Sequence, residues 1–168
     1  MSAMIRVIFV CAGNICRSPM AEAVFRHLVA EAGLADHIET ASAGTGDWHV
    51  GEPPHRGTQE ILTQHGVTWQ GQRARRLGTQ DLLDFDYVVV MDRDNLFNVE
   101  TMARRVPATG EISRLTDWAD PADTNGFTDV PDPFYAGGFD GVYKMVFSGC
   151  TGLLGHIRQA HKLPPEGM

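Results

Sequence analysis

The sequence contains few cysteines, and this scarcity narrows the class of protein. Only 3 cysteines occur among 168 residues, an odd number that does not provide the disulfide framework of a small secreted protein. The first residues lack the apolar core of a signal peptide, and Cys11 and Cys16 have no partners at the spacing of a zinc site. We therefore expect a protein of the reducing cytoplasm that holds no metal ion.

Positive charge and long apolar segments are also scarce. Lys and Arg number 14 against 21 Asp and Glu, which gives a formal net charge of -7. The one local basic cluster, Arg73, Arg75 and Arg76, is too small for the basic stripe of a nucleic-acid-binding protein. No segment reaches the roughly 20 apolar residues that span a bilayer, and neither G-x-G-x-x-G nor a Walker loop indicates a nucleotide. We expect no nucleic-acid partner, no membrane partner and no cofactor.

The segments that are present suit one α/β domain covering residues 1–168. Apolar runs alternate with segments of helical periodicity, which predicts a four-stranded parallel sheet flanked by helices on both faces, a Rossmann-like arrangement. The irregular stretch 118–138, rich in Asp, Pro and Gly, predicts a functional loop, and 161–168 is expected to be a flexible tail. The expected strands are 5–10, 38–43, 87–91 and 112–115, and the expected helices are 18–32, 55–65, 79–85, 93–103 and 139–160.

The segment from Cys11 to Ser18 carries the clearest chemical signal. It follows the first expected strand and precedes a helix, for which we expect Ser18 as N-cap and Pro19 as first residue. Backbone N–H groups at this helix start, together with the guanidinium of Arg17, would bind an oxyanion, and Gly13 and Asn14 tolerate a left-handed turn. The same positive field favours the thiolate of Cys11. A thiolate beside bound phosphate predicts phosphoryl transfer to sulfur.

Two motifs at opposite ends of the chain match one enzyme family. The segment 10–21, VCAGNICRSPMA, resembles the signature loop of the low-molecular-weight protein tyrosine phosphatases, and Asp132-Pro133-Phe134-Tyr135 resembles their second hallmark. The resemblance covers nearly the whole chain. It implies an enzyme that hydrolyses phosphotyrosine in proteins through a phosphocysteine intermediate and releases inorganic phosphate.

The resemblance also implies roles for particular residues. Cys11 is the expected nucleophile, Arg17 the phosphate clamp, and Asp132 the acid that protonates the leaving phenolate and then activates water. Ser18 would assist the sulfur leaving group, and Cys16 could form a reversible disulfide with the nucleophile. The expected substrate-binding residues are Ala12, Gly13, Asn14, Ile15, Cys16 and Ser18 in the loop, and Trp48, Phe134 and Tyr135 as walls for the phenyl ring.

Some positions leave alternatives open. Relatives that act on phosphoarginine carry threonine where this chain has Ile15. An arsenate reductase of the same fold needs further cysteines, whereas Cys150 is the only one beyond the loop. A non-catalytic phosphate-binding module is the remaining alternative. Asp92 is expected to cap a helix, and Gln72 stands where family members commonly have a histidine that braces Asn14.

Overall fold

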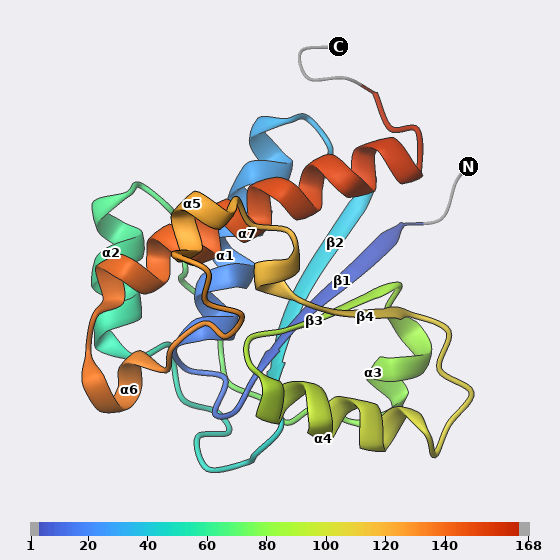
Figure 1. Cartoon of the computed structure of the whole chain (residues 1–168), viewed down its shortest axis with the longest axis horizontal. Coiled ribbons are helices and arrows are strands. Elements are labelled where there is room, and N and C mark those ends of the chain that lie inside the picture. The colour runs from blue at the N-terminus through green and yellow to red at the C-terminus, as the bar shows by residue number, and fades with distance from the viewer. Residues whose placement is uncertain (1–3, 165–168) are drawn as a thin grey trace.

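A four-stranded sheet forms the centre of the computed structural model, which describes residues 4–164 (Figure 1). All neighbouring strands run parallel in the order β2-β1-β3-β4, with Val7 of β1 opposite Thr40 of β2 and Tyr87 of β3. This confirms the predicted fold class. The strands are β1 (Ile5–Cys11), β2 (Ile38–Gly44), β3 (Tyr87–Val90) and β4 (Glu111–Arg114).

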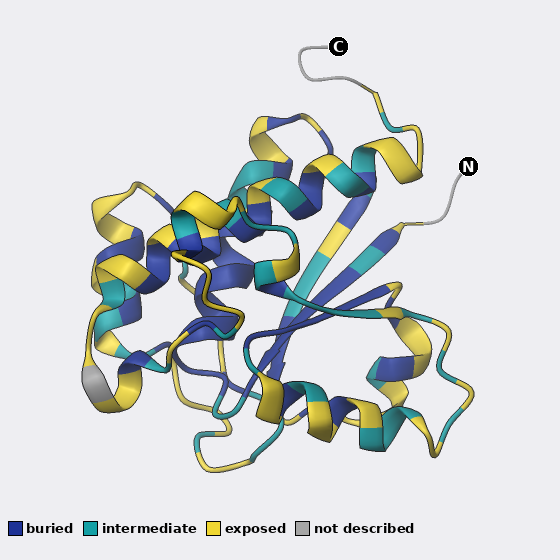
Figure 2. Cartoon of the chain, viewed as in Figure 1, coloured by how far each residue is buried: buried dark blue, intermediate teal, exposed yellow. Residues whose placement is uncertain are grey.

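Helices cover both faces of this sheet, because the central strand is apolar on both sides (Figures 1 and 2). Alternate side chains of a strand point to opposite faces, so Val7 and Phe9 belong to one core whereas Ile8 and Val10 belong to the other. The first core is closed by α1 (Arg17–Glu31), α2 (Arg56–Gln64) and α7 (Phe139–Ala160), and the second by α3 (Thr79–Asp84) and α4 (Arg93–Ala103).

The long stretch 118–138 is less irregular than its composition predicts. It follows a 3-10 turn, η1 (Leu115–Asp117), and contains two short helices, α5 (Pro121–Thr124) and α6 (Pro133–Ala136). Each of the two begins with a proline directly after an aspartate that caps it, as is favoured at helix starts. The stretch is therefore held in place by local capping, and Val130 adds a backbone hydrogen bond to Met91 at 2.8 Å.

The expected flexible tail is not seen at its first residues. His161 Nε2 lies 2.8 Å from the hydroxyl of Tyr87, and Leu163 packs against the first core while its N–H donates to Arg158. These contacts hold the chain against the sheet beyond the end of α7, and residues 165–168 lie outside the described part. Within residues 4–164, none of the helices combines the length and the hydropathy that crossing a membrane demands.

Candidate active site

The segment 11–18 lies at the carboxyl end of β1, where ligands of parallel sheets bind. It is tied to the end of β2, because Thr45 N–H donates to Cys11 O and Gly46 N–H donates to Ala12 O, both at 2.9 Å. The backbones approach so closely that a Cβ on Gly44 would lie 2.7 Å from Ala12 O. Glycine at this position therefore lets β2 support the loop.

The sulfur of Cys11 is buried and surrounded by hydrogen-bond donors. The N–H of Asn14 donates to Sγ at 3.3 Å, and Ser18 Oγ lies 2.9 Å from Sγ. Because Ser18 Oγ already accepts a hydrogen bond from Asn14 Nδ2 at 2.8 Å, its own proton is free to point at the sulfur. Both contacts are of the kind that can donate a hydrogen bond to sulfur.

Ser18 is not the N-cap that the sequence predicts. Helix α1 begins two residues earlier, at Arg17 in place of Pro19, with Cys16 in the N-cap position and no side-chain cap among the described residues. The hydroxyl of Ser18 is instead occupied by Asn14 and directed toward Cys11. The first N–H groups of α1 consequently receive no side-chain cap and can bind an anion.

Asn14 holds the loop in its left-handed turn, as predicted, with φ of 58°. Its Nδ2 donates to Ser42 Oγ at 3.0 Å, and its Oδ1 accepts from the N–H of Arg75 at 2.9 Å. Ser42 in turn donates to Glu22 Oε1 at 2.6 Å. The loop asparagine is thus fixed by groups from β2, from α1 and from the connection before α3.

Gln72 does not take the place of the family histidine beside Asn14. Its Nε2 donates to the backbone oxygen of Pro19 at 3.1 Å, and its buried Oε1 has no partner among the described residues. The sequence did not show which residue holds the side chain of Asn14 in place of the histidine. In the structure Ser42 and the backbone of Arg75 hold it, because both lie on segments next to the loop.

Arg17 is buried beneath the loop and held by one of its terminal nitrogens. Nη1 donates to Asp92 Oδ2 at 2.6 Å and to Val130 O at 2.9 Å, whereas Nη2 lies 3.5 Å from Asp132 Oδ2. Burial opposes the charged guanidinium, but the negative charges of Cys11, Asp92 and Asp132 outweigh it and raise the pKa of Arg17. The buried Nε has no partner among residues 4–164, so it remains able to bind an anion.

Asp92 has a second contact that sequence reasoning missed. As predicted, its Oδ1 caps α4 by accepting from the N–H of Asn95 at 2.8 Å. Its other oxygen holds Arg17, which lies 75 residues earlier in the chain. The available signal was its position at the carboxyl end of β3, the edge of the sheet to which Cys11 also belongs.

Asp132 stands at the opening of the site and caps α6. Its Oδ1 accepts from the N–H of Phe134 at 3.0 Å, and its Oδ2 faces Arg17. The side chain is 29% exposed, so the carboxyl can exchange protons with solvent. Among the aspartates of the loop 118–138, Asp129 instead pairs with Arg93.

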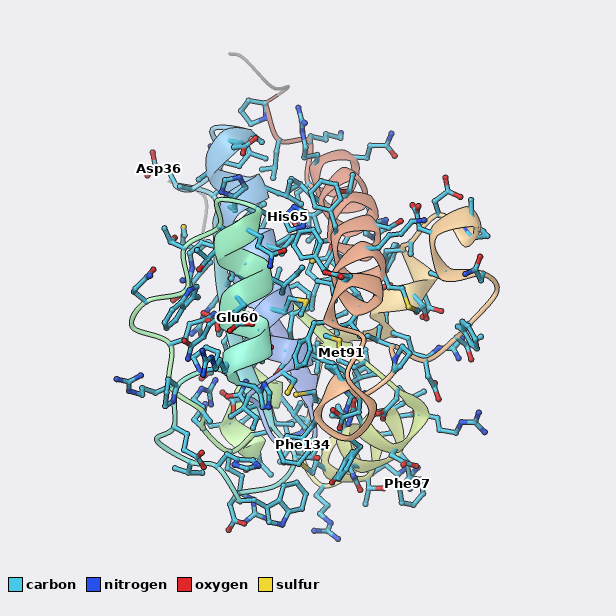
Figure 3. All side chains as sticks on the ribbon, turned by 90° about the vertical axis from the view of Figure 1, so that its left-hand side faces the viewer. Asp36, Glu60, His65, Met91, Phe97 and Phe134 are labelled. Atoms are coloured by element: carbon cyan, nitrogen blue, oxygen red, sulfur yellow. The ribbon has the colours of Figure 1, made fainter. Side chains whose placement is uncertain are left out.

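A cleft of about 210 Å³ opens between the phosphate-binding loop and aromatic side chains from two other segments. Trp48 and Tyr135 are exposed at its rim, and Phe134, which also lines the cleft, lies in the lower part of the view in Figure 3. Most of the predicted site residues line this cleft. Asn14 and Ser18 do not line it but contact the sulfur of Cys11. His49 also lines the cleft, and it was not predicted from the sequence although it follows Trp48. The lining residues are Cys11, Ala12, Gly13, Ile15, Cys16, Arg17, Trp48, His49, Asp132, Phe134 and Tyr135.

The other two cysteines are buried neutral thiols. Burial, followed by the charges of Cys11 and Asp132, raises the pKa of Cys16 to about 12. Burial alone raises the pKa of Cys150, which lies in α7 and contacts the backbone of Ala21. A disulfide between Cys16 and Cys11 stays a prediction.

Comparison with known proteins agrees with this geometry. The family model for low molecular weight phosphotyrosine protein phosphatase matches residues 6–163. The chain belongs to this family. It is 48% identical over 160 residues to the low molecular weight protein-tyrosine-phosphatase YfkJ of Bacillus subtilis, covering 95% of this chain and 100% of that protein. It is 44% identical over 163 residues to the phosphatase PtpA of Staphylococcus saprophyticus, covering 97% and 100%.

Solved structures of the family superimpose closely on the chain. The crystal structure of YfkJ from Bacillus subtilis has a TM-score of 0.89 over 95% of this chain and 98% of that one. The Drosophila arginine phosphatase has a TM-score of 0.84 at 36% identity, covering 92% and 98%. Membership of the family makes the chain a protein tyrosine phosphatase, a hydrolase of phosphoric monoesters, with phosphoproteins as its class of substrate.

Proposed function

We propose that Cys11, Arg17 and Asp132 carry out the hydrolysis of phosphotyrosine in this chain. The thiolate of Cys11 attacks phosphorus, and the bond from phosphorus to the phenolic oxygen breaks. Asp132 gives its proton to that oxygen, so tyrosine leaves as a neutral phenol. The phosphoryl group is then bound to sulfur, and its charge faces the loop N–H groups and Arg17.

In the second step, water replaces the sulfur. The carboxylate of Asp132 takes a proton from water, the oxygen attacks phosphorus, and the bond to sulfur breaks. Sulfur leaves as a thiolate, which the N–H of Asn14 and the hydroxyl of Ser18 stabilise. Inorganic phosphate departs, and the enzyme returns to its starting state.

The observation that best supports these roles is that the nitrogens of the Arg17 guanidinium have different partners. One end is fixed to Asp92 and Val130, while Nε remains buried without a partner among the described residues. A buried donor without a partner lowers stability by about 1–3 kcal/mol. Because Nε would gain a partner when an anion binds, its position near the Cys11 thiol suits an anionic ligand. The cleft above it has the aromatic sides Trp48 and Tyr135, which suit a phenyl ring.

The remaining expectations also enter this proposal. A core that extends from Ile5 to Ile157 supports one phosphatase domain. The net charge of -7 makes the protein repel the phosphates of nucleic acids, which supports the absence of a nucleic-acid partner. Its three free cysteines support a cytoplasmic location.

Replacement of Asp132 tests the proposed function. A phenolate has a conjugate acid of pKa about 10, and a positioned general acid contributes about 10²- to 10⁴-fold. Asp132→Ala should lose that factor in single-turnover cleavage of phenyl phosphate and lose much less with aryl phosphates whose leaving groups are stable anions. A loss of equal size across the series would remove Asp132 as the acid.

Asp129→Ala is the matched control for this test. Asp129 lies in the same loop, but its carboxylate contacts Arg93 outside the cleft. The control should keep the wild-type dependence on the leaving group. If it shows the selective loss instead, Asp129 is the acid.

A further inference from the structure

His55 connects three segments that surround the cleft. Its backbone N–H donates to Ile15 O in the phosphate-binding loop at 2.6 Å. Its ring stacks on Phe139, the first residue of α7, with centroids 5.2 Å apart and planes at 20°. Its Nδ1 accepts from the N–H of Gly57 at 3.0 Å and so caps α2. The side chain is half-buried, and the cleft itself is lined by other residues.

The edge of the same ring meets Phe134 in the segment that carries the proposed acid. The ring centroids of His55 and Phe134 are 5.8 Å apart with planes at 75°, and His49 approaches Phe134 at 5.8 Å from the cleft side. His49 is itself fixed, because its Nδ1 lies 2.8 Å from Glu52 Oε2. Phe134 is therefore in contact with two histidine rings from the segment that follows β2.

Helix α6 is held by its cap residue Asp132, by the buried Pro133 and by the ring of Phe134. The hydrogen bonds described for its backbone are local: Phe134 N–H donates to Asp132 Oδ1, and Gly137 N–H donates to Pro133 O. Beyond it, Gly137 and Gly138 take φ of 72° and 79°, conformations that favour glycine. A helix of four residues with such an ending depends on side-chain packing for its position.

The position of Phe134 is coupled directly to Asp132. The N–H of Phe134 holds one carboxyl oxygen of Asp132 at 3.0 Å, and the other oxygen is 3.5 Å from Arg17 Nη2. Loss of the ring contact would release the short helix that carries this N–H, and a shift of its backbone would re-aim the carboxyl. Misplacement of a reacting group by about 1 Å costs up to about 10²-fold in rate.

We propose that His55 is a positioning residue for the general acid, acting through the contact of its ring with Phe134. The inference rests on the proposed role of Asp132. It assigns His55 two separable tasks: the ring holds α6 in place for proton transfer, and Nδ1 caps α2 for stability. The ring contact is absent from the sequence pattern, because Phe134 lies 79 positions from His55.

Two substitutions separate these tasks. His55→Asn removes the ring but still offers a hydrogen-bond acceptor, a side-chain oxygen in place of Nδ1, that suits the N-cap. His55→Phe keeps an aromatic ring and removes the acceptor. Both retain the backbone N–H that donates to Ile15. Single-turnover rates with a series of aryl phosphates, inhibition by inorganic phosphate and thermal midpoints would be measured for each.

His55→Asn should cleave phenyl phosphate at least about tenfold more slowly, while substrates with stable anionic leaving groups change by less than about twofold. Inhibition by inorganic phosphate should stay as in wild type, because the loop bond to Ile15 is kept. His55→Phe should keep the wild-type dependence on the leaving group and lower the thermal midpoint by about 3 °C through the lost cap.

His65→Asn is the matched control. His65 ends the same helix α2 and stacks on Tyr143 of α7 at 3.9 Å, but it lies far from Phe134 (Figure 3). This variant should change stability without changing the dependence on the leaving group. Should His55→Asn not fold, Phe134→Leu removes the same ring contact from the other side and should give the same selective loss.

A double substitution distinguishes failure of the inference from failure of the proposed function. If His55 acts through Asp132, adding His55→Asn to Asp132→Ala should slow phenyl phosphate cleavage by less than about twofold further. A selective loss in Asp132→Ala with none in His55→Asn would overturn the positioning role alone. A uniform loss in His55→Asn would also overturn it, since damage to the loop affects every substrate equally.

Discussion

The phosphate-binding loop and the rim of the cleft are built in opposite ways. Cys11, Asn14 and Arg17 are exposed by only 2%, 3% and 2%. Each is held from another segment: Thr45, directly after β2, binds the backbone of Cys11, and Ser42 of β2 binds Asn14. Arg17 is held by Asp92, the cap of α4, and by Val130. Trp48 and Tyr135, in contrast, are exposed by 69% and 85%. The proposed phosphate-binding groups are therefore fixed before substrate arrives, whereas the proposed walls for the phenyl ring stand in solvent.

This difference has an energetic consequence. Fixed donors need no reorganisation when charge develops at phosphorus, and such preorganised sites give large rate effects. Ordering an exposed side chain on binding costs about 0.5–1.5 kcal/mol, which reduces what each aromatic wall contributes. Changes in the loop should therefore alter catalysis strongly, and changes in the rim should alter selectivity modestly.

Cys11→Ser tests the loop side of the comparison with the largest expected effect. Turnover should fall to background, because serine supplies no thiolate, while phosphate and vanadate still bind to the N–H groups and Arg17. Turnover assays and binding of vanadate would be measured together. Residual turnover near the wild-type rate would exclude the covalent mechanism.

Arg17→Lys should have the next largest effect. A point ammonium cannot keep the contacts to Asp92 and Val130 while also presenting a planar donor pair to phosphate. Loss of one such donor costs about 10²- to 10³-fold in turnover. Steady-state rates measure this, and near-normal activity in the lysine variant would show that the fork geometry is unimportant.

Trp48→Ala tests the rim and should have a smaller effect. Removing one aromatic wall should lower kcat/KM for phenyl phosphate by about tenfold, which corresponds to about 1.4 kcal/mol. Inhibition by inorganic phosphate should be unchanged, because that ligand has no ring. Phe97→Ala is the control, since Phe97 is also exposed but lies on α4 outside the cleft lining.

Ile15→Thr asks whether the loop itself takes part in selectivity. Ile15 lines the cleft and is buried against Ala74 and Phe139, so a smaller polar residue should widen the site. The ratio of phosphoarginine to phosphotyrosine hydrolysis should rise by up to about tenfold. Parallel assays on both peptides measure the ratio, Ile15→Val serves as the apolar control, and an unchanged ratio would exclude Ile15 as the selector.

Alkaline unfolding tests how well the loop excludes water, through stability instead of activity. The raised pKa of Cys16, about 12 against an ordinary 9.0, means that the unfolded chain loses this proton first. Its contribution to stability is complete below pH 9 and is lost as the pH rises toward 12, by at most about 1.4 kcal/mol per unit. Denaturant titrations from pH 8 to 10.5 should show a shallower decline for Cys16→Ala than for wild type.

The sequence alone was sufficient for the four strands, for α1, α2, α3, α4 and α7 and for the motif, but not for α5 and α6 within 118–138. Apolar runs and cap residues lie within a few neighbouring positions, so strands, helices, the cap at Asp92 and the left-handed Asn14 were predictable. The start of α1 was not, because Ser18 is a favourable cap residue by itself. In the folded chain its hydroxyl contacts Asn14 and Cys11 instead of capping the helix.

The contacts that complete the site were decided only by the tertiary structure. Asp92 and Val130 hold Arg17, Ser42 and Arg75 hold Asn14, and His49 joins the cleft. The partners of Arg17 and Asn14 lie between 28 and 113 positions from them. The sequence determined which chemistry this protein can perform, because a thiol and an arginine with five residues between them lie on one short segment. The parallel sheet decided what surrounds them, since it brings the carboxyl ends of distant strands to one edge.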